Sequence, residues 1–247
     1  MSLPIPRRSL LWLISLVLLF TAIDGVVQLG LVSTMVAFIH SYSGTPILVL
    51  PSDDDNGPPY PISSFPENLV TNPGHVANAA GGTAVVLVGF GGAVALAVQK
   101  RSRRKHKKSH PLFYLWSLIV LLSFLLTLGA LIYAFAETAN LSGQTIDEAI
   151  ARQNPPPAKY PLGQWTPETW GDAVLLLPLA NNVQRHRIHG KVDIMRAWRW
   201  NLLALLICGF ALLMVVGLEL VRLRWGEEEE EEEEVKSEGV PVLTVRE

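Results

Sequence analysis

Four long segments with few or no charged side chains constrain this chain more than any other feature. The clearest is residues 112–136, which contain no charged residue at all. A helix rises about 1.5 Å per residue, so about 20 apolar residues cross a hydrocarbon core about 30 Å thick. We therefore predict an all-α fold, a four-helix transmembrane bundle, with spans at residues 10–39, 77–98, 112–136 and 201–221.

The first span has an alternative interpretation. Residues 1–9 carry Arg7 and Arg8 and precede a strongly apolar run, a pattern that is also typical of a secretory signal peptide. Apolar character resumes after Asp24, however, and no clear small-x-small cleavage site follows the run. We expect residues 10–39 to be retained as a membrane helix, with cleavage as the alternative.

The distribution of Lys and Arg predicts the orientation, because short cytoplasmic loops are enriched in these residues. The connection at residues 99–111 is dense in them, whereas the loop at residues 40–76 has none. This places residues 1–9, 99–111 and 222–247 in the cytoplasm and the loops 40–76 and 137–200 outside. The loop 137–200 also holds five bases near the fourth span, but long loops translocate largely regardless of charge.

The basic connection predicts contact with lipid headgroups. Seven bases bounded by two spans can lie against anionic lipids, each contributing about 1 kcal/mol near the surface. Nucleic acid binding or nuclear import is disfavoured by the two flanking spans, so we expect no nucleic acid partner. The predicted headgroup contacts are Lys100, Arg101, Arg103, Arg104, Lys105, Lys107 and Lys108.

The two outer loops differ in their sequence patterns. Residues 40–76 are rich in Pro, Ser and Asp without helical periodicity, which predicts an irregular loop. In the second loop, Thr145 and Glu148 fit a capping box for a short helix ending near Gln153. Thr166, followed by a proline, predicts a second helix start, and a third amphipathic segment runs into the fourth span.

The tail at residues 222–247 contains the acidic run Glu227 to Glu234. Its composition predicts a disordered acidic cytoplasmic tail. The run lies on the same predicted side as the basic connection. It is therefore either a solvated brush or a competitor of anionic lipid for Lys100 to Lys108.

Individual residues within the spans suggest further sites. Asp24 and Gln28 place polar groups in an apolar helix, where ionisable residues are costly and often functional, although an interfacial or packing role is the alternative. Gly89, Ala93 and Ala97 recur every four residues, which indicates a small-residue face for close helix packing; a weakly packed span is the alternative. Asn140 heads the only N-glycosylation sequon, close to the third span.

The stretch WTPETWGDAVLLLPLA, with MRAWRWNLLALL after it, resembles uncharacterised four-span membrane proteins of filamentous fungi that are similar to MARVEL-type proteins in layout. The matching part covers residues 165–206. The resemblance implies membrane residence and a helical bundle, and it supplies no catalytic residues.

These observations lead to a functional expectation. The sequence presents no nucleophile–base set and a single cysteine, Cys208, so we expect no enzyme, cofactor or metal site. We expect a membrane-organising or adaptor protein with membrane-protein partners, in the plasma membrane or an endomembrane. The alternative is a small transporter or channel subunit that uses Asp24 and Gln28.

Overall fold

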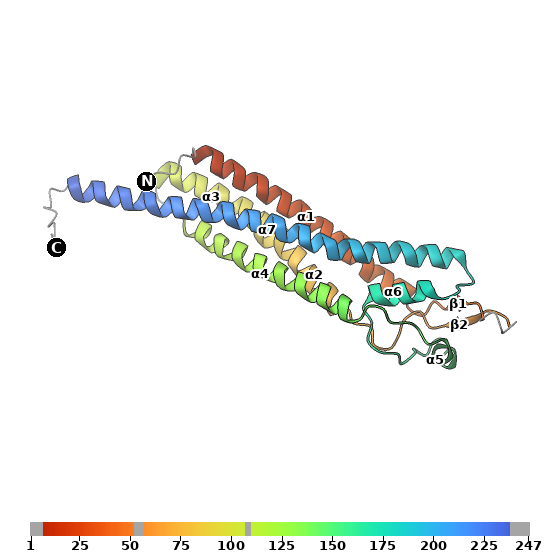
Figure 1. The fold of residues 1–247 in the computed structure, drawn as a ribbon. Helices are drawn as coiled ribbons and strands as arrows, with labels where there is room; N and C mark the ends of the chain where they lie inside the picture. The colour runs from red at the N-terminus through yellow and green to blue at the C-terminus, as the bar shows by residue number, and fades with distance from the viewer. Residues whose placement is uncertain (1–6, 52–56, 107–109, 238–247) are drawn as a thin grey trace, which may run out of the picture.

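Four long helical rods run side by side, and their connections gather at the two ends (Figure 1). This computed structural model describes the backbone of residues 7–51, 57–106 and 110–237, and the side chains of residues 10–51, 57–102 and 110–225. The first, third and fourth rods are the helices α1 (Arg7–Tyr42), α4 (Pro111–Asn140) and α7 (Asn182–Ser237). The second rod consists of α2 (Asn72–Thr83), the π-helix η1 (Ala84–Phe90) and α3 (Gly91–His106).

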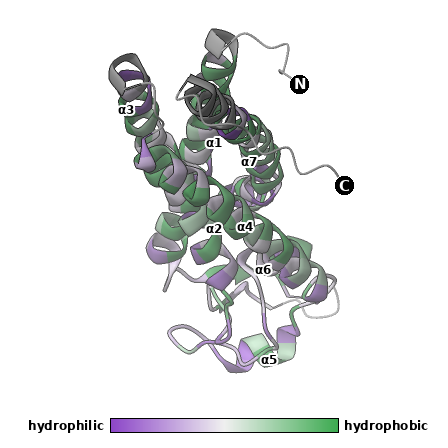
Figure 2. Cartoon of the chain, turned by 90° about the vertical axis from the view of Figure 1, so that its left-hand side faces the viewer, coloured by the Kyte–Doolittle hydropathy of each residue, from purple (hydrophilic) through white to green (hydrophobic). Residues whose placement is uncertain are grey.

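All four rods are long and apolar enough to cross a membrane, over Leu10–Tyr42, Asn72–Ser102, Pro111–Asn140 and Asn182–Trp225. Many large apolar side chains on these rods are exposed, and much of the ribbon of the rods has the hydrophobic colour in Figure 2. Such a surface suits lipid rather than water. The predicted four-helix transmembrane bundle is confirmed.

The helices extend beyond the predicted spans. The largest difference concerns α7, which joins the amphipathic segment, the fourth span and the start of the acidic tail in one helix. The prediction of disorder from residue 222 is therefore wrong for residues 222–237. Glutamate is a good helix former, no glycine or proline lies between residues 227 and 237, and extending an existing helix needs no new nucleus. Residues 238–247 lie outside the described residues.

The basic connection is shorter than predicted. α3 continues to His106 and α4 begins at Pro111, so residues 99–106 are helical instead of forming part of a loop. His110 is the N-cap of α4, and its Nδ1 accepts a hydrogen bond from the Leu112 amide at 3.2 Å. Proline at the first helical position of α4 loses no intrahelical bond. The basic residues thus lie mainly on two extra helical turns.

The two loops at the other end fold together. The strands β1 (Ile47–Val49) and β2 (Tyr60–Ile62) pair antiparallel in the first loop, which was predicted to be irregular. Single bridges then join Val49 to Leu179 and Leu69 to Trp165, connecting the first loop to the second. We call residues 43–51, 57–71 and 141–181 together the loop domain.

The second loop contributes the helices α5 (Glu148–Gln153) and α6 (Pro167–Leu176). Thr166 caps α6, as predicted. The predicted cap of α5 is wrong: the Asp147 carboxylate, not Thr145, accepts hydrogen bonds from the Ala149 and Ile150 amides. Glu148 accepts a hydrogen bond from the Tyr60 hydroxyl of β2, which orients it away from the Thr145 backbone.

The loop domain shares its core with two of the rods. Aromatic residues from both loops, among them Phe65, Trp165 and Trp170, pack with the end of α1 and the beginning of α7. Phe65 and Trp170 have ring centroids 4.6 Å apart. The core includes Phe38 of α1 and Met195 of α7, so the domain is fixed to the bundle by packing rather than by flexible tethers.

Candidate functional site

A polar cluster lies inside the bundle, where α1 meets α7. The amide of Asn201 donates hydrogen bonds to the Gln28 side-chain oxygen at 3.0 Å and to the Asp24 backbone carbonyl at 3.4 Å. Gln28 is fully buried. Within the described residues, the Asp24 Oδ2 atom is buried and has no hydrogen-bond partner. The structure therefore brings Asp24 and Gln28 together and adds Asn201, which the sequence interpretation missed.

A small cavity lies about one helical turn from this cluster, because Thr21 and Leu205, three and four residues from Asp24 and Asn201, line it. Its volume is about 10 Å³, which corresponds to about one water molecule. Asp24, Gln28 and Asn201 themselves do not line this cavity.

Glycines mark where α1 and the second rod approach closely. A Cβ atom at Gly25 would lie 3.1 Å from the Gly81 carbonyl oxygen, and one at Gly89 would lie 3.0 Å from the Ala22 Cβ. Gly89 thus lies at a helix contact. Ala93 and Ala97 are exposed, so the predicted face of Gly89, Ala93 and Ala97 does not form a single packing surface within this chain.

The spacing of four residues explains this difference. An α-helix has 3.6 residues per turn, so positions four residues apart drift by about 40° around the helix axis at each step. Among the described side chains of α3, the buried residues are instead Gly92, Ala95 and Gln99. A Cβ atom at Gly92 would lie 2.7 Å from the Trp116 ring, whose indole NH donates to the Val88 carbonyl at 3.1 Å.

The basic end of the bundle contains the predicted headgroup contacts. Lys100 and Arg101 are exposed at the end of α3. The side chains of Arg103, Arg104 and Lys105, and the whole of Lys107 and Lys108, lie outside the described residues. At the opposite end, Asn140 is the last residue of α4 and is exposed, so its predicted glycosylation stays a prediction.

A charged network lies at the base of the loop domain, where α6 meets α7. The Glu168 Oε1 atom accepts a hydrogen bond from Arg199 at 2.8 Å and lies 3.9 Å from the Arg196 Nε. Arg196 also donates to Asp172 at 2.6 Å. Arg199 further stacks over the Phe135 ring of α4, 4.7 Å from its centroid. The network therefore links the loop domain to two membrane helices.

Glu168 is the most unusual member of this network. The residue is only 6% exposed, and within the described residues its second carboxylate oxygen, Oε2, has no hydrogen-bond partner. Burial raises the pKa of the Glu168 carboxyl above its ordinary value, and the neighbouring Arg199 guanidinium opposes that shift. An unpaired oxygen on a buried carboxylate is costly, so this position requires a physical explanation.

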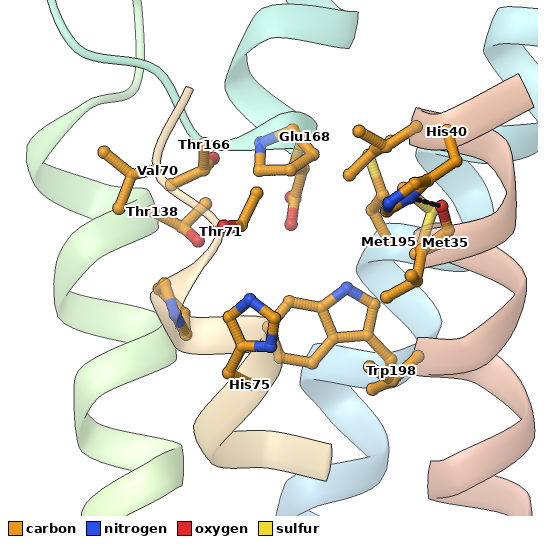
Figure 3. Close-up of a pocket in the computed structure, with 16 residues that line it drawn as sticks. Met35, His40, Val70, Thr71, His75, Thr138, Thr166, Glu168, Met195 and Trp198 are labelled. Atoms are coloured by element: carbon orange, nitrogen blue, oxygen red, sulfur yellow. Dashed lines mark hydrogen bonds between the residues drawn. The ribbon is translucent and has the colours of Figure 1, made fainter. Parts of the chain in front are cut away.

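Glu168 lines a pocket of about 120 Å³ between the loop domain and the bundle (Figure 3). Apolar side chains dominate its walls, and Glu168 projects from α6 toward His75 and Trp198. Four further residues with polar side chains also line it: His40, Thr71, Thr138 and Thr166. The remaining lining residues come from α1, α6, α7, the start of α2 and the segment that leads into it: Val32, Met35, Val36, Ile39, Val70, Pro73, Gly74, Pro167 and Met195.

Sequence reasoning missed this pocket because its residues are scattered along the chain. In the sequence, Glu168 is an acidic residue in the first turn of a helix, and such residues are common near the positive end of the helix dipole. Only the packing of α6 on α7 shows that its carboxylate is buried. Among the residues that the structure describes, no group of three or more His, Cys, Asp or Glu side chains could hold a metal ion.

Comparison of the chain with protein-family models, with curated proteins and with solved structures gives no match. The class of protein therefore follows from the fold itself: a multi-pass, helical membrane protein with a folded loop domain at one end of the bundle. The likeness to four-span MARVEL-type proteins stays a prediction.

Proposed function

We propose that this protein is a non-enzymatic membrane-organising or adaptor protein of the plasma membrane or an endomembrane. In this proposal the loop domain lies on the outer side of the membrane, and the basic and acidic segments lie in the cytoplasm. One observation carries the proposal: α7 is a single helix of 56 residues, or about 84 Å, that belongs to the loop-domain core at one end and extends past Trp225 at the other. A hydrocarbon core spans only about 30 Å of that length.

The loop domain supports the proposal because it is folded and exposes apolar side chains that another protein could contact. Exposed apolar side chains gather where β1 meets the end of α6 and the start of α7: Leu48, Leu50, Leu176 and Val183. Hydrogen bonds hold these segments together, from Leu50 NH to the Pro178 carbonyl and from Ala180 NH to the Leu48 carbonyl. Exposed apolar side chains in a group favour contact with another protein.

The other end supports the proposal through its charge. Lys100 and Arg101 project at the end of α3, where contact with anionic headgroups would fix the bundle in the bilayer. In this proposal the seven bases of residues 100–108 bind anionic lipid. The acidic run of α7 follows the fourth span, so in this topology it lies on the same side of the membrane as the seven bases. There it would compete with anionic lipid for them.

Proximity labelling tests the adaptor role. We expect a labelling enzyme fused to the cytoplasmic tail, and a second fused into the loop domain, to identify reproducible neighbours on opposite sides of one membrane. Changing Leu176 and Val183 together to serine should remove loop-domain neighbours, whereas the exposed control Lys159→Ala should leave them unchanged. Loop-domain neighbours that are identical for the wild-type protein, the double serine variant and Lys159→Ala would contradict the proposal.

A second candidate function is transport, favoured by the buried Oδ2 of Asp24, which has no hydrogen-bond partner in the described part of the chain and belongs to the cluster with Gln28 and Asn201. The discriminating variant is Asp24→Asn, assayed in proteoliposomes with an imposed proton or cation gradient. If Asp24 carries the ion, flux through the wild-type protein should be abolished in the variant. The adaptor proposal expects no difference in flux between the two proteins.

A further inference from the structure

The pocket beneath α6 contains an acceptor without a donor. Glu168 is 6% exposed, its Oε1 atom is engaged by Arg199 at 2.8 Å, and its Oε2 atom has no partner among the described residues. Figure 3 shows the carboxylate directed into the pocket, toward His75 and Trp198. Because a buried carboxylate oxygen without a hydrogen-bond donor is unfavourable, a bound group that donates a hydrogen bond to it would be stabilised.

The apolar residues that line the pocket favour a ligand whose hydrogen-bond donor is attached to an apolar part. The pocket is bounded by Val32, Met35 and Ile39 of α1 on one side and by Met195 and Trp198 of α7 on another. Methionine side chains adapt to irregular apolar shapes. A volume of about 120 Å³ is close to the roughly 150 Å³ cavity that holds benzene in an engineered protein, so it accepts the end of a larger molecule.

The position of the pocket indicates where that molecule comes from. α2 begins at Asn72 and α4 ends at Asn140, and residues next to both ends, His75 and Thr138, line the pocket. The pocket therefore lies at the boundary of the apolar bundle. The exposed lining residues Val36, His40 and His75 mark its opening. At this depth lipid molecules carry their polar heads while their apolar parts extend into the bilayer.

The charges around Glu168 indicate whether the polar head of the ligand is cationic, anionic or neutral. The negative charge of Glu168 is already offset by Arg199 at 2.8 Å and Arg196 at 3.9 Å. A cationic head would add an uncompensated buried charge, and an anionic head would face the carboxylate directly; both are costly. A neutral hydroxyl donates one hydrogen bond to Oε2 without changing the net charge of the site.

We propose that this pocket binds the hydroxyl-bearing end of a neutral lipid alcohol, with Glu168 Oε2 as the hydrogen-bond acceptor and the apolar part of the lipid leaving between α1 and α2. The site is distinct from the apolar loop-domain surface of the adaptor proposal. Either inference can therefore fail without the other.

Photolabelling tests the site with the full-length protein in phosphatidylcholine nanodiscs. The probe is a long-chain alcohol that carries a diazirine near its head and an alkyne at its tail. Two further probes replace the hydroxyl with a carboxylate or an amine. We expect saturable labelling by the alcohol, on peptides from α1, α2 or α6, and at least about tenfold weaker labelling by the charged probes, equivalent to about 1.4 kcal/mol.

Two variants and two matched controls complete the design. Val36→Trp narrows the opening without touching the charged network, and Glu168→Gln weakens the acceptor; both should reduce alcohol labelling about tenfold. Val27→Trp, at a similarly exposed position of α1 outside the pocket, and Glu67→Gln, at an exposed position of the loop domain outside both the pocket and the charged network, should leave it unchanged. If Glu168→Gln does not fold, as judged by size-exclusion chromatography, Val36→Trp still decides.

Several outcomes would overturn the proposal. They are unsaturable labelling, equal labelling of Val36→Trp and Val27→Trp, or preferential labelling by the amine or carboxylate probe. Competition with an unlabelled sterol, a monoacylglycerol or the free long-chain alcohol identifies which source of hydroxyl fits best. Displacement by any one of them supports the neutral-alcohol site, and displacement by none of them contradicts it.

Discussion

The membrane bundle and the loop domain place the same residue types in opposite positions. In the bundle, Trp12 of α1 is 76% exposed, whereas Trp170 in the loop domain is completely buried. Within the bundle, α1 and the second rod approach each other through glycine and alanine, whereas aromatic rings fill much of the core of the loop domain. The difference follows from the surrounding solvent. Burial of apolar surface drives folding in water, whereas between helices in lipid there is no such driving force, so close packing determines how the helices associate.

The charged network marks the transition between the two regions. Glu168 belongs to the loop domain, while Arg199 and Phe135 belong to helices that cross the membrane. Trp198 packs against both the aromatic core of the loop domain and the alanine-rich cluster of the bundle. A substitution here should affect both regions, whereas substitutions on either side should act locally.

The largest expected effect is in the loop domain. Trp170→Ala removes a fully buried indole that packs on Phe65 and donates a hydrogen bond to Tyr160, and should destabilise the domain by about 3–5 kcal/mol. Protease cleavage between residues 141 and 181 in reconstituted vesicles measures this loss. Trp12→Ala, the lipid-exposed control, should leave cleavage at the wild-type rate. Equal sensitivity of both variants would contradict the contrast between the regions.

The second effect tests packing in the bundle. Gly25→Leu places side-chain atoms against the Gly81 backbone and should destabilise the α1–α2 contact by about 1–3 kcal/mol. Gly30→Leu is the matched control on the same helix, since a Cβ atom there meets nothing within 4 Å. Thermal aggregation in detergent, followed by size-exclusion chromatography, compares the two. A more damaging Gly30 variant would show that helix contacts are elsewhere.

The third effect concerns the cap of α5. Asp147→Ala removes the acceptor of two backbone amides and should destabilise the loop domain by about 1 kcal/mol. Thr145→Ala should have no measurable effect, because Thr145 does not cap the helix in this structure. The same protease assay detects both. A larger loss for the threonine variant would restore the cap that the sequence predicts.

The smallest effect depends on pH. Because burial raises the pKa of Glu168, its contribution to stability is fully present below the ordinary carboxyl value and is lost as pH rises through the raised value. Glu168→Gln keeps a neutral side chain at every pH. The stability of the wild-type protein relative to this variant, measured by thermal unfolding, should therefore fall as the pH rises above the ordinary carboxyl pKa of 4.5. A rise instead would mean that Arg199 outweighs burial.

Several local features were predictable from neighbouring residues alone. Thr166 followed by proline identified the start of α6, because capping depends on residues within one turn. The π-helix and the β1–β2 pair were not predictable in this way, and Ala93 and Ala97 lie outside the expected packing face. Asp24 and Gln28 were recognisable as unusual, but their partner Asn201 is more than 170 residues away along the chain.

The sequence by itself determined that the chain is a helical membrane protein with four spans, because the length and apolarity of a segment decide whether it crosses a bilayer. Only the tertiary structure decided that both loops form one domain and that Glu168 faces a pocket, with one carboxylate oxygen that no described residue pairs. Burial, hydrogen bonding and cavity shape arise from residues that are distant in the chain and meet only when the helices pack.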